Sequence, residues 1–131
     1  MAFNGNFMCT SFKVEVLKAV HNFTAASNIF KLAMYTNGNE VSGTNYTAKG
    51  NAVTTVTPVA SSTTALVDMN DVVFSNVTVS AVRGALIYND AASGDPTVCV
   101  LDFGSDKAAT AGDFTVVMPT ADASNAIIRI A

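Results

Sequence analysis

Apolar residues recur at helical spacing in one part of the chain, the stretch that follows Thr10-Ser11. There they fall close to every third or fourth position, which is the spacing of one face of an α-helix. A Ser or Thr can cap the first turn, and Asn22 supplies a stop. The pattern predicts a helix over residues 11–22, with His21 at its carboxyl end, where a protonated ring would interact favourably with the helix dipole. The apolar positions are Phe12, Val16, Ala19, Val20 and Phe23.

From residue 28 onward the pattern changes to short runs rich in Val, Thr, Ile and Phe, bounded by Gly, Asn, Asp, Ser or Pro. Seven or eight such strands predict a small antiparallel β-sandwich, jelly-roll-like, over residues 28–131. In the run 77–82 the alternation slips at Ala81-Val82, and Gly84 suggests a bulge or a close backbone approach. The expected strands are 28–35, 52–59, 65–68, 72–74, 77–89, 97–103, 114–118 and 126–130.

Composition narrows the class of protein. The 131 residues suit one domain, and a net charge of -3 with only 13% charged residues disfavours a nucleic-acid binder. No apolar run approaches the roughly 20 residues that cross a bilayer, so we expect no membrane partner. The amino end shows no secretory signal, so the protein is expected to work where it is made or to leave the cell by a route other than secretion. Cys9 and Cys99 could form one disulfide, but burial as free thiols is the simpler expectation.

The chain offers little catalytic chemistry. His21 is the sole histidine, so every His-dependent triad or metal site would have to use it, and no nucleophile lies in a recognisable motif. Asp68 and Asp71, with Asn70 between them, could offer oxygen ligands to calcium, but turn formation explains them more simply. Asp102 is expected to pair with Arg83 or Lys107. We therefore expect no enzyme activity, no metal and no cofactor.

Both ends of the chain carry apolar residues that suit association. The amino-terminal arm, residues 1–9, holds Phe3, Phe7 and Met8 and has no charge before Lys13. Such an arm is either a further strand of its own domain, the slightly favoured alternative, or an anchor on a neighbouring subunit. The carboxyl end stops on an apolar run, 126–130, that is expected to be packed rather than frayed.

Several segments together, spread in order over nearly the whole chain, resemble a family of small structural proteins of the virions of tailed bacteriophages. They are Ser11–Lys13, Asn39–Tyr46, Arg83–Asn89, Val100–Lys107 and Ala126–Ile130. The resemblance implies a virion component with no catalytic residues. It implies tight backbone geometry at Gly43, Gly84 and Gly104, and fixed polar pairs within an apolar sandwich. The residues of those pairs would be Arg83, Asp102, Asp106, Lys107 and Arg129.

On this resemblance, the first functional hypothesis is a capsid decoration or cement protein that bridges and stabilises capsomers. Its partners would be phage capsid or tail proteins and further copies of itself, with a trimer favoured, and it would lie in virions assembled in the cytoplasm of a bacterial host. A tail, baseplate or fibre-attachment module is the alternative. A lectin-like carbohydrate-binding domain or a hydrolase is a third hypothesis, against which the absence of tryptophan and of paired carboxylates weighs.

Overall fold

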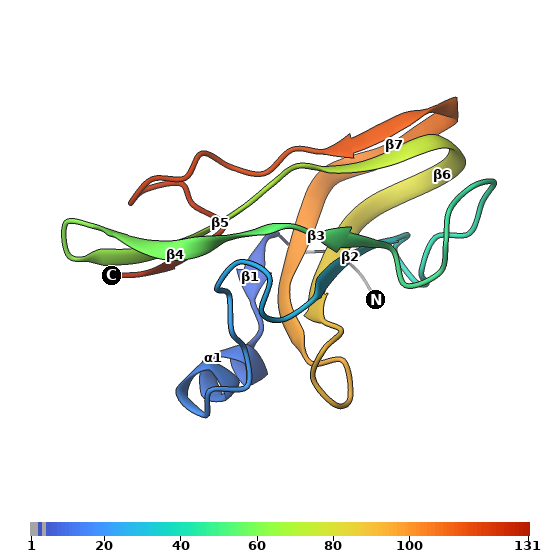
Figure 1. Ribbon diagram of the computed structural model, residues 1–131. Helices are drawn as coiled ribbons and strands as arrows, with labels where there is room; N and C mark the ends of the chain where they lie inside the picture. Colours follow the sequence, from blue (N-terminus) through green and yellow to red (C-terminus); the bar gives the residue numbers. More distant parts are fainter. Residues whose placement is uncertain (1–2, 4) are drawn as a thin grey trace.

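The computed structural model describes residue 3 and residues 5–131, and within that range the protein is mainly β, with two antiparallel sheets and one short helix (Figure 1). This confirms the predicted fold class. The helix is α1 (Thr10–Leu17). The strands are β1 (Phe7–Met8), β2 (Phe30–Tyr35), β3 (Asn51–Val53), β4 (Thr55–Ser61), β5 (Thr64–Met69), β6 (Val72–Asn89), β7 (Thr97–Val116) and β8 (Ile128–Ile130).

The larger sheet has the order β1-β7-β6-β2-β3, and the smaller has the order β4-β5-β8. Only Thr54 separates β3 from β4, so the chain passes from one sheet to the other at that point. One cluster of buried apolar side chains takes members from both sheets, including Phe30 and Ile87 from the larger sheet and Met69 and Ile128 from the smaller. Each sheet therefore covers an apolar face of the other, as in a sandwich.

The helix is shorter than the sequence predicted, because the chain leaves the helical path at Ala19. The amide of Ala19 donates to the carbonyl of Val16, and that of Val20 donates to Glu15, while Ala19 has a φ of 58°. This is the Schellman ending, here with alanine where glycine is usual. The prediction of Thr10 or Ser11 as the cap was also wrong, since Cys9 occupies that position and makes no side-chain cap bond. No helix in the described residues is long and apolar enough to span a membrane.

His21 lies beyond the helix, so the predicted contact with the helix dipole was wrong. Its side chain is fully buried, and its Nε2 lies 2.8 Å from a carboxylate oxygen of Glu15. Its Nδ1 lies 3.2 Å from the side-chain nitrogen of Asn89, which has no exposed surface. Because the Asn89 amide nitrogen donates, Nδ1 accepts and Nε2 carries the proton toward Glu15. The imidazole is thus a satisfied part of the core that fastens the chain after α1 to the end of β6.

Two long strands replace four of the short strands that were expected. β6 joins the expected runs 72–74 and 77–89, and β7 joins 97–103 to 114–118, ending at Val116. They form one hairpin that curves so that its outer half, residues 72–82 and 107–116, lies over β2 and β3 (Figure 1). The curvature coincides with register shifts and with positive φ values at Asn76, Ala81 and Ala111, a combination that marks β-bulges containing a left-handed residue.

The bulges explain why the alternation of β6 slips. Val72, Phe74, Val77, Val79 and Val82 are all buried, so the inward face is kept although the spacing changes from two residues to three at Asn76 and Ala81. The slip at Ala81 is a bulge. Gly84 lies beside a further register shift and is also a close approach, because a Cβ there would overlap the Leu101 carbonyl and the Phe3 ring.

Gly43 and Gly104, the other two glycines expected to need tight backbone geometry, are favoured for different reasons. A Cβ on Gly43 would overlap the carbonyl of Thr78, to which the adjacent Thr44 is bridged. Gly104 has open space around it and a φ of 79°, which favours glycine for backbone reasons alone.

Candidate functional site

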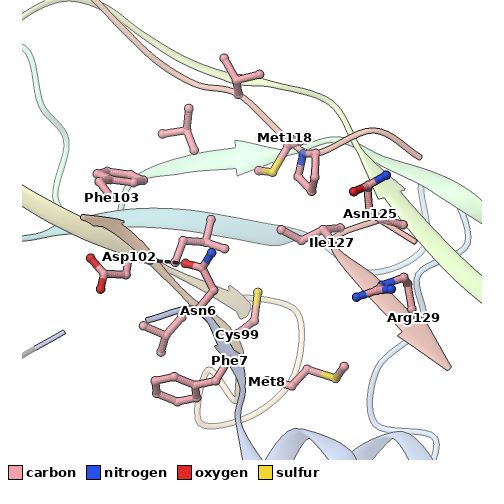
Figure 2. Close-up of a pocket in the computed structure, with 16 residues that line it drawn as sticks. Asn6, Phe7, Met8, Cys99, Asp102, Phe103, Met118, Asn125, Ile127 and Arg129 are labelled. Atoms are coloured by element: carbon pink, nitrogen blue, oxygen red, sulfur yellow. Dashed lines mark hydrogen bonds between the residues drawn. The ribbon is translucent and has the colours of Figure 1, made fainter. Parts of the chain in front are cut away.

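A groove of about 610 Å³ lies between the edges of the two sheets (Figure 2). One wall comes from β1 and the first residues of β7. The other wall comes from the segment after β7 and from β8. Since β1 and β8 each end the strand order of their sheet, the groove runs along two strands that each have a free edge.

The walls of the groove are apolar and its two ends are polar. Asp102 and Asn6 lie at one end, and Arg129 and Asn125 lie toward the other (Figure 2). Phe7 and Val117 expose 53% and 73% of their surface, which is much for large apolar residues in a groove. A second hollow, of about 430 Å³, shares Phe103, Val116 and Val117 with it. The apolar lining of the groove consists of Phe7, Met8, Cys99, Val100, Leu101, Phe103, Val116, Val117, Met118, Pro119, Ala126 and Ile127.

Asp102 holds the amino-terminal arm against β7. Its carboxylate accepts hydrogen bonds of 2.8 Å from the backbone amides of Gly104 and Gly5, and its own amide donates to the side chain of Asn6. The two amide bonds, with a smaller contribution from Arg83, lower the pKa of Asp102 below its ordinary value. The arm is thus attached by hydrogen bonds to a charged group, which are stronger than neutral ones.

Asp102→Asn is expected to destabilise the protein at pH 7 and to make its melting temperature less sensitive to acid. A carboxylate whose pKa is lower in the folded state stabilises that state above its unfolded pKa, near 4, and the contribution is lost as the pH falls through the folded-state value. Melting temperatures between pH 7 and pH 2 measure this. Asp106→Asn is the control, because Asp106 is 57% exposed at its side chain. A difference between Asp102→Asn and the unchanged protein that stayed constant over the whole range would contradict the prediction.

Arg83 lies between Asp102 and Asp106, the two aspartates that were expected from the resemblance to form polar pairs. Its Nε is 3.8 Å from Asp102 and its Nη1 is 3.7 Å from Asp106. Nε is buried, and within the described residues it makes no hydrogen bond. Lys107 makes no ion pair with any described residue and instead lines the second hollow. Arg129 donates to the Ala123 carbonyl at 3.3 Å. Within the part of the chain that the structure describes, the ion pairs among the five residues are those of Arg83 with Asp102 and Asp106.

The three arm residues predicted as anchors lie in different surroundings. Phe3 is buried against Gly84. β1 pairs with β7 of the same chain, with Phe7 opposite Val100 and Met8 opposite Cys99. The arm is therefore a strand of its own fold, while the exposed ring of Phe7 remains available at the groove. Met1, Ala2 and Asn4 of the predicted arm lie outside the described residues.

The remaining candidate chemistry is structural. Asp71 accepts from the amide of Met118 at 2.7 Å, which ties the start of β6 to the segment after β7. The described residues contain no group of three His, Cys, Asp or Glu side chains that could hold a metal. Both cysteines are free thiols, and burial, with a smaller contribution from Cys9, raises the pKa of Cys99 to about 12. The one thiol that lines the groove is therefore protonated at neutral pH.

The groove residues after β7 were not expected from the sequence. Val117 and Met118 lie at the end of the expected strand 114–118, Asn125 lies in the loop after it, and Ile127 lies in the expected strand 126–130, and nothing in the pattern indicates that they line one groove. The signal that could have indicated them is the run Val116-Val117-Met118, which is too apolar for an exposed turn and ends at Pro119. Searches against family models, curated proteins and solved structures find nothing that matches this chain.

Proposed function

We propose that this protein is a non-enzymatic structural component of a bacteriophage virion, and that it acts as a decoration or cement protein that bridges neighbouring capsomers. In this function the chain supplies buried area between shell subunits and performs no chemistry. The resemblance of the sequence to phage structural proteins supports the assignment to a virion. The groove supports the binding of a protein partner.

The observation that carries the proposal is the groove between β1 and β8. Edge strands present unpaired backbone groups, and an extended segment of a partner can add to such an edge while its side chains enter flanking pockets. The apolar walls would bury alternate side chains of that segment, and the polar ends, Asp102 and Arg129, would orient it. An extended arm of a shell protein has the chemistry that such a groove accepts.

The copy number of the protein in purified virions tests the proposal directly. A shell component repeats with the capsid lattice, so quantitative mass spectrometry should find on the order of hundreds of copies. About a dozen copies or fewer would place the protein in the tail or baseplate instead. Absence from the particles, with binding of isolated glycans, would favour the lectin-like alternative.

Val117→Asp is expected to weaken binding to capsids that lack the protein by about tenfold or more. Val117 is 73% exposed, so the fold should tolerate the change. An unpaired carboxylate buried under a partner costs more than the roughly 1–3 kcal/mol of a neutral polar group, and about 1.4 kcal/mol already corresponds to tenfold in affinity. Co-sedimentation with the capsids measures the affinity.

Val14→Asp is the matched control, because Val14 is 49% exposed on α1 and lies outside the groove. Equal binding by both variants would show that the groove does not contact the shell.

A further inference from the structure

The end of the β4–β5 hairpin extends beyond the helix and the larger sheet, where β8 and the carboxyl end lie beside it (Figure 1). Thr55 is buried at the base of β4, but every residue from Val56 to Ser61 is exposed. Val59 exposes 57% of its surface and Ile130, at the end of β8, exposes 59%. The hairpin thus presents large apolar side chains to solvent beyond the core.

One face of this hairpin continues the core face of the smaller sheet. Ala60 lies opposite Ala65, and Ala65 lies opposite Ile130. Because side chains alternate along a strand, Ala65 shares its face with Val67 and Met69, both of which are buried. The same apolar face is therefore covered by the core at one end and left uncovered at the other.

The outer edge of β4 has free backbone groups. β4 ends the strand order of its sheet, and the described contact on this side is the Ala25 amide donating to the Thr57 hydroxyl at 3.1 Å. Proteins often protect such edges with lysine or proline. Pro58 protects only the bulge between Val56 and Val59, which leaves Val59–Ser61 as a run able to pair.

The charge distribution favours a second copy of this chain as the partner. No residue from Gly50 to Val67 is charged, although the whole chain carries a net charge of -3. In a contact about a two-fold axis the same surface of each copy meets the other, so an edge with a net charge would face an edge of the same net charge. An uncharged edge avoids this repulsion, and an antiparallel edge strand matches itself about such an axis.

We propose that two copies of this chain associate by antiparallel pairing of Val59–Ser61 of β4, which joins their smaller sheets into one. This inference rests on the proposed function in one respect: in a virion component, this pairing would be the contact between neighbouring copies of the protein. The contact forms in the isolated protein and requires neither the groove nor a capsid.

The test is the molar mass of the purified protein by light scattering over a range of concentrations. The unchanged protein should form a dimer, or an even-numbered assembly built from dimers. The double variant Val59→Lys with Ser61→Lys places charges of like sign across the paired edges, and it should raise the dissociation constant at least tenfold. The control carries the same two kinds of change elsewhere, Val14→Lys with Ser105→Lys, both at exposed positions, and should associate like the unchanged protein.

Circular dichroism establishes that both double variants are folded. A second probe is Ala60→Cys, which lies at the centre of the pairing and should form a disulfide between copies on mild oxidation, whereas Ser105→Cys should not. A protein that is monomeric at every concentration, or a trimer that the lysines leave intact, would overturn the inference. If the protein is a monomer that still binds capsids, the dimer inference is wrong and the proposed function stands. If the protein is a dimer that is absent from virions, the dimer inference stands and the proposed function is wrong.

Discussion

Phe30→Ala is expected to lower the free energy of unfolding by about 3–5 kcal/mol, the usual cost of removing a fully buried aromatic ring. Phe30 has no exposed surface, and its ring stacks on that of Phe23 with centroids 4.5 Å apart. The His21 ring lies 6.2 Å away on the same cluster. The change would open a cavity where the chain after α1 packs on β2, and a loss of this size is a large part of the stability of an ordinary domain.

Urea unfolding followed by circular dichroism measures the Phe30 effect. Phe7→Ala removes the same atoms from a ring that is half exposed, so it should cost less than about 1.5 kcal/mol. A loss at Phe30 no greater than the loss at Phe7 would mean that the aromatic cluster does not hold α1 to the sheet.

Gly50→Ala is expected to cost about 3 kcal/mol, because it combines two separate penalties. Gly50 has a φ of 76°, where an alanine pays about 1–2 kcal/mol. A Cβ there would also overlap the backbone carbonyl of Leu32, and relieving such overlap costs about 1–3 kcal/mol. The overlapping atoms belong to the backbone of β2, so no side-chain rotation can relieve the clash.

Gly94→Ala separates the two penalties. Gly94 has a φ of 83°, but nothing lies within 4 Å of a Cβ built on it. It should therefore show the conformational cost alone, about 1–2 kcal/mol. Thermal or urea unfolding of both variants gives the comparison, and equal losses at Gly50 and Gly94 would exclude steric overlap as the cause of the Gly50 effect.

The fold class could be predicted because it depends on local pattern, whereas strand lengths depend on pairing between distant segments. The outer part of β7, from Gly104 to Ala111, is almost entirely exposed, so no apolar alternation marks it as strand. It is a strand because β6 lies beside it and supplies the backbone partners. The end of α1 was missed for a similar reason, since the helical spacing continues to Phe23 although the backbone turns at Ala19.

The site could be predicted only in part. Asp102 was expected to pair with Arg83 or Lys107 because it lies in an apolar run, where a charge needs a partner, and among the described residues it pairs with Arg83. The groove could not be expected, because it is formed by the amino-terminal arm, β7 and the segment before β8, and only the topology brings these together. The sequence also could not show that Phe3 would be buried and Phe7 exposed, since both precede the helix in a similar polar context.

The bulges of the long hairpin have a consequence for how this protein can change in evolution. Each extra residue at Asn76, Ala81 or Ala111 exchanges which side of its strand faces inward. Deletion of one of these residues would exchange the buried and exposed faces of the strand as far as the next bulge, so that valines would become exposed and serines would face the core. The outer half of the hairpin should therefore accept many substitutions but very few insertions or deletions. Diverged homologues of this chain should keep the length of this segment even where they have lost sequence identity to it.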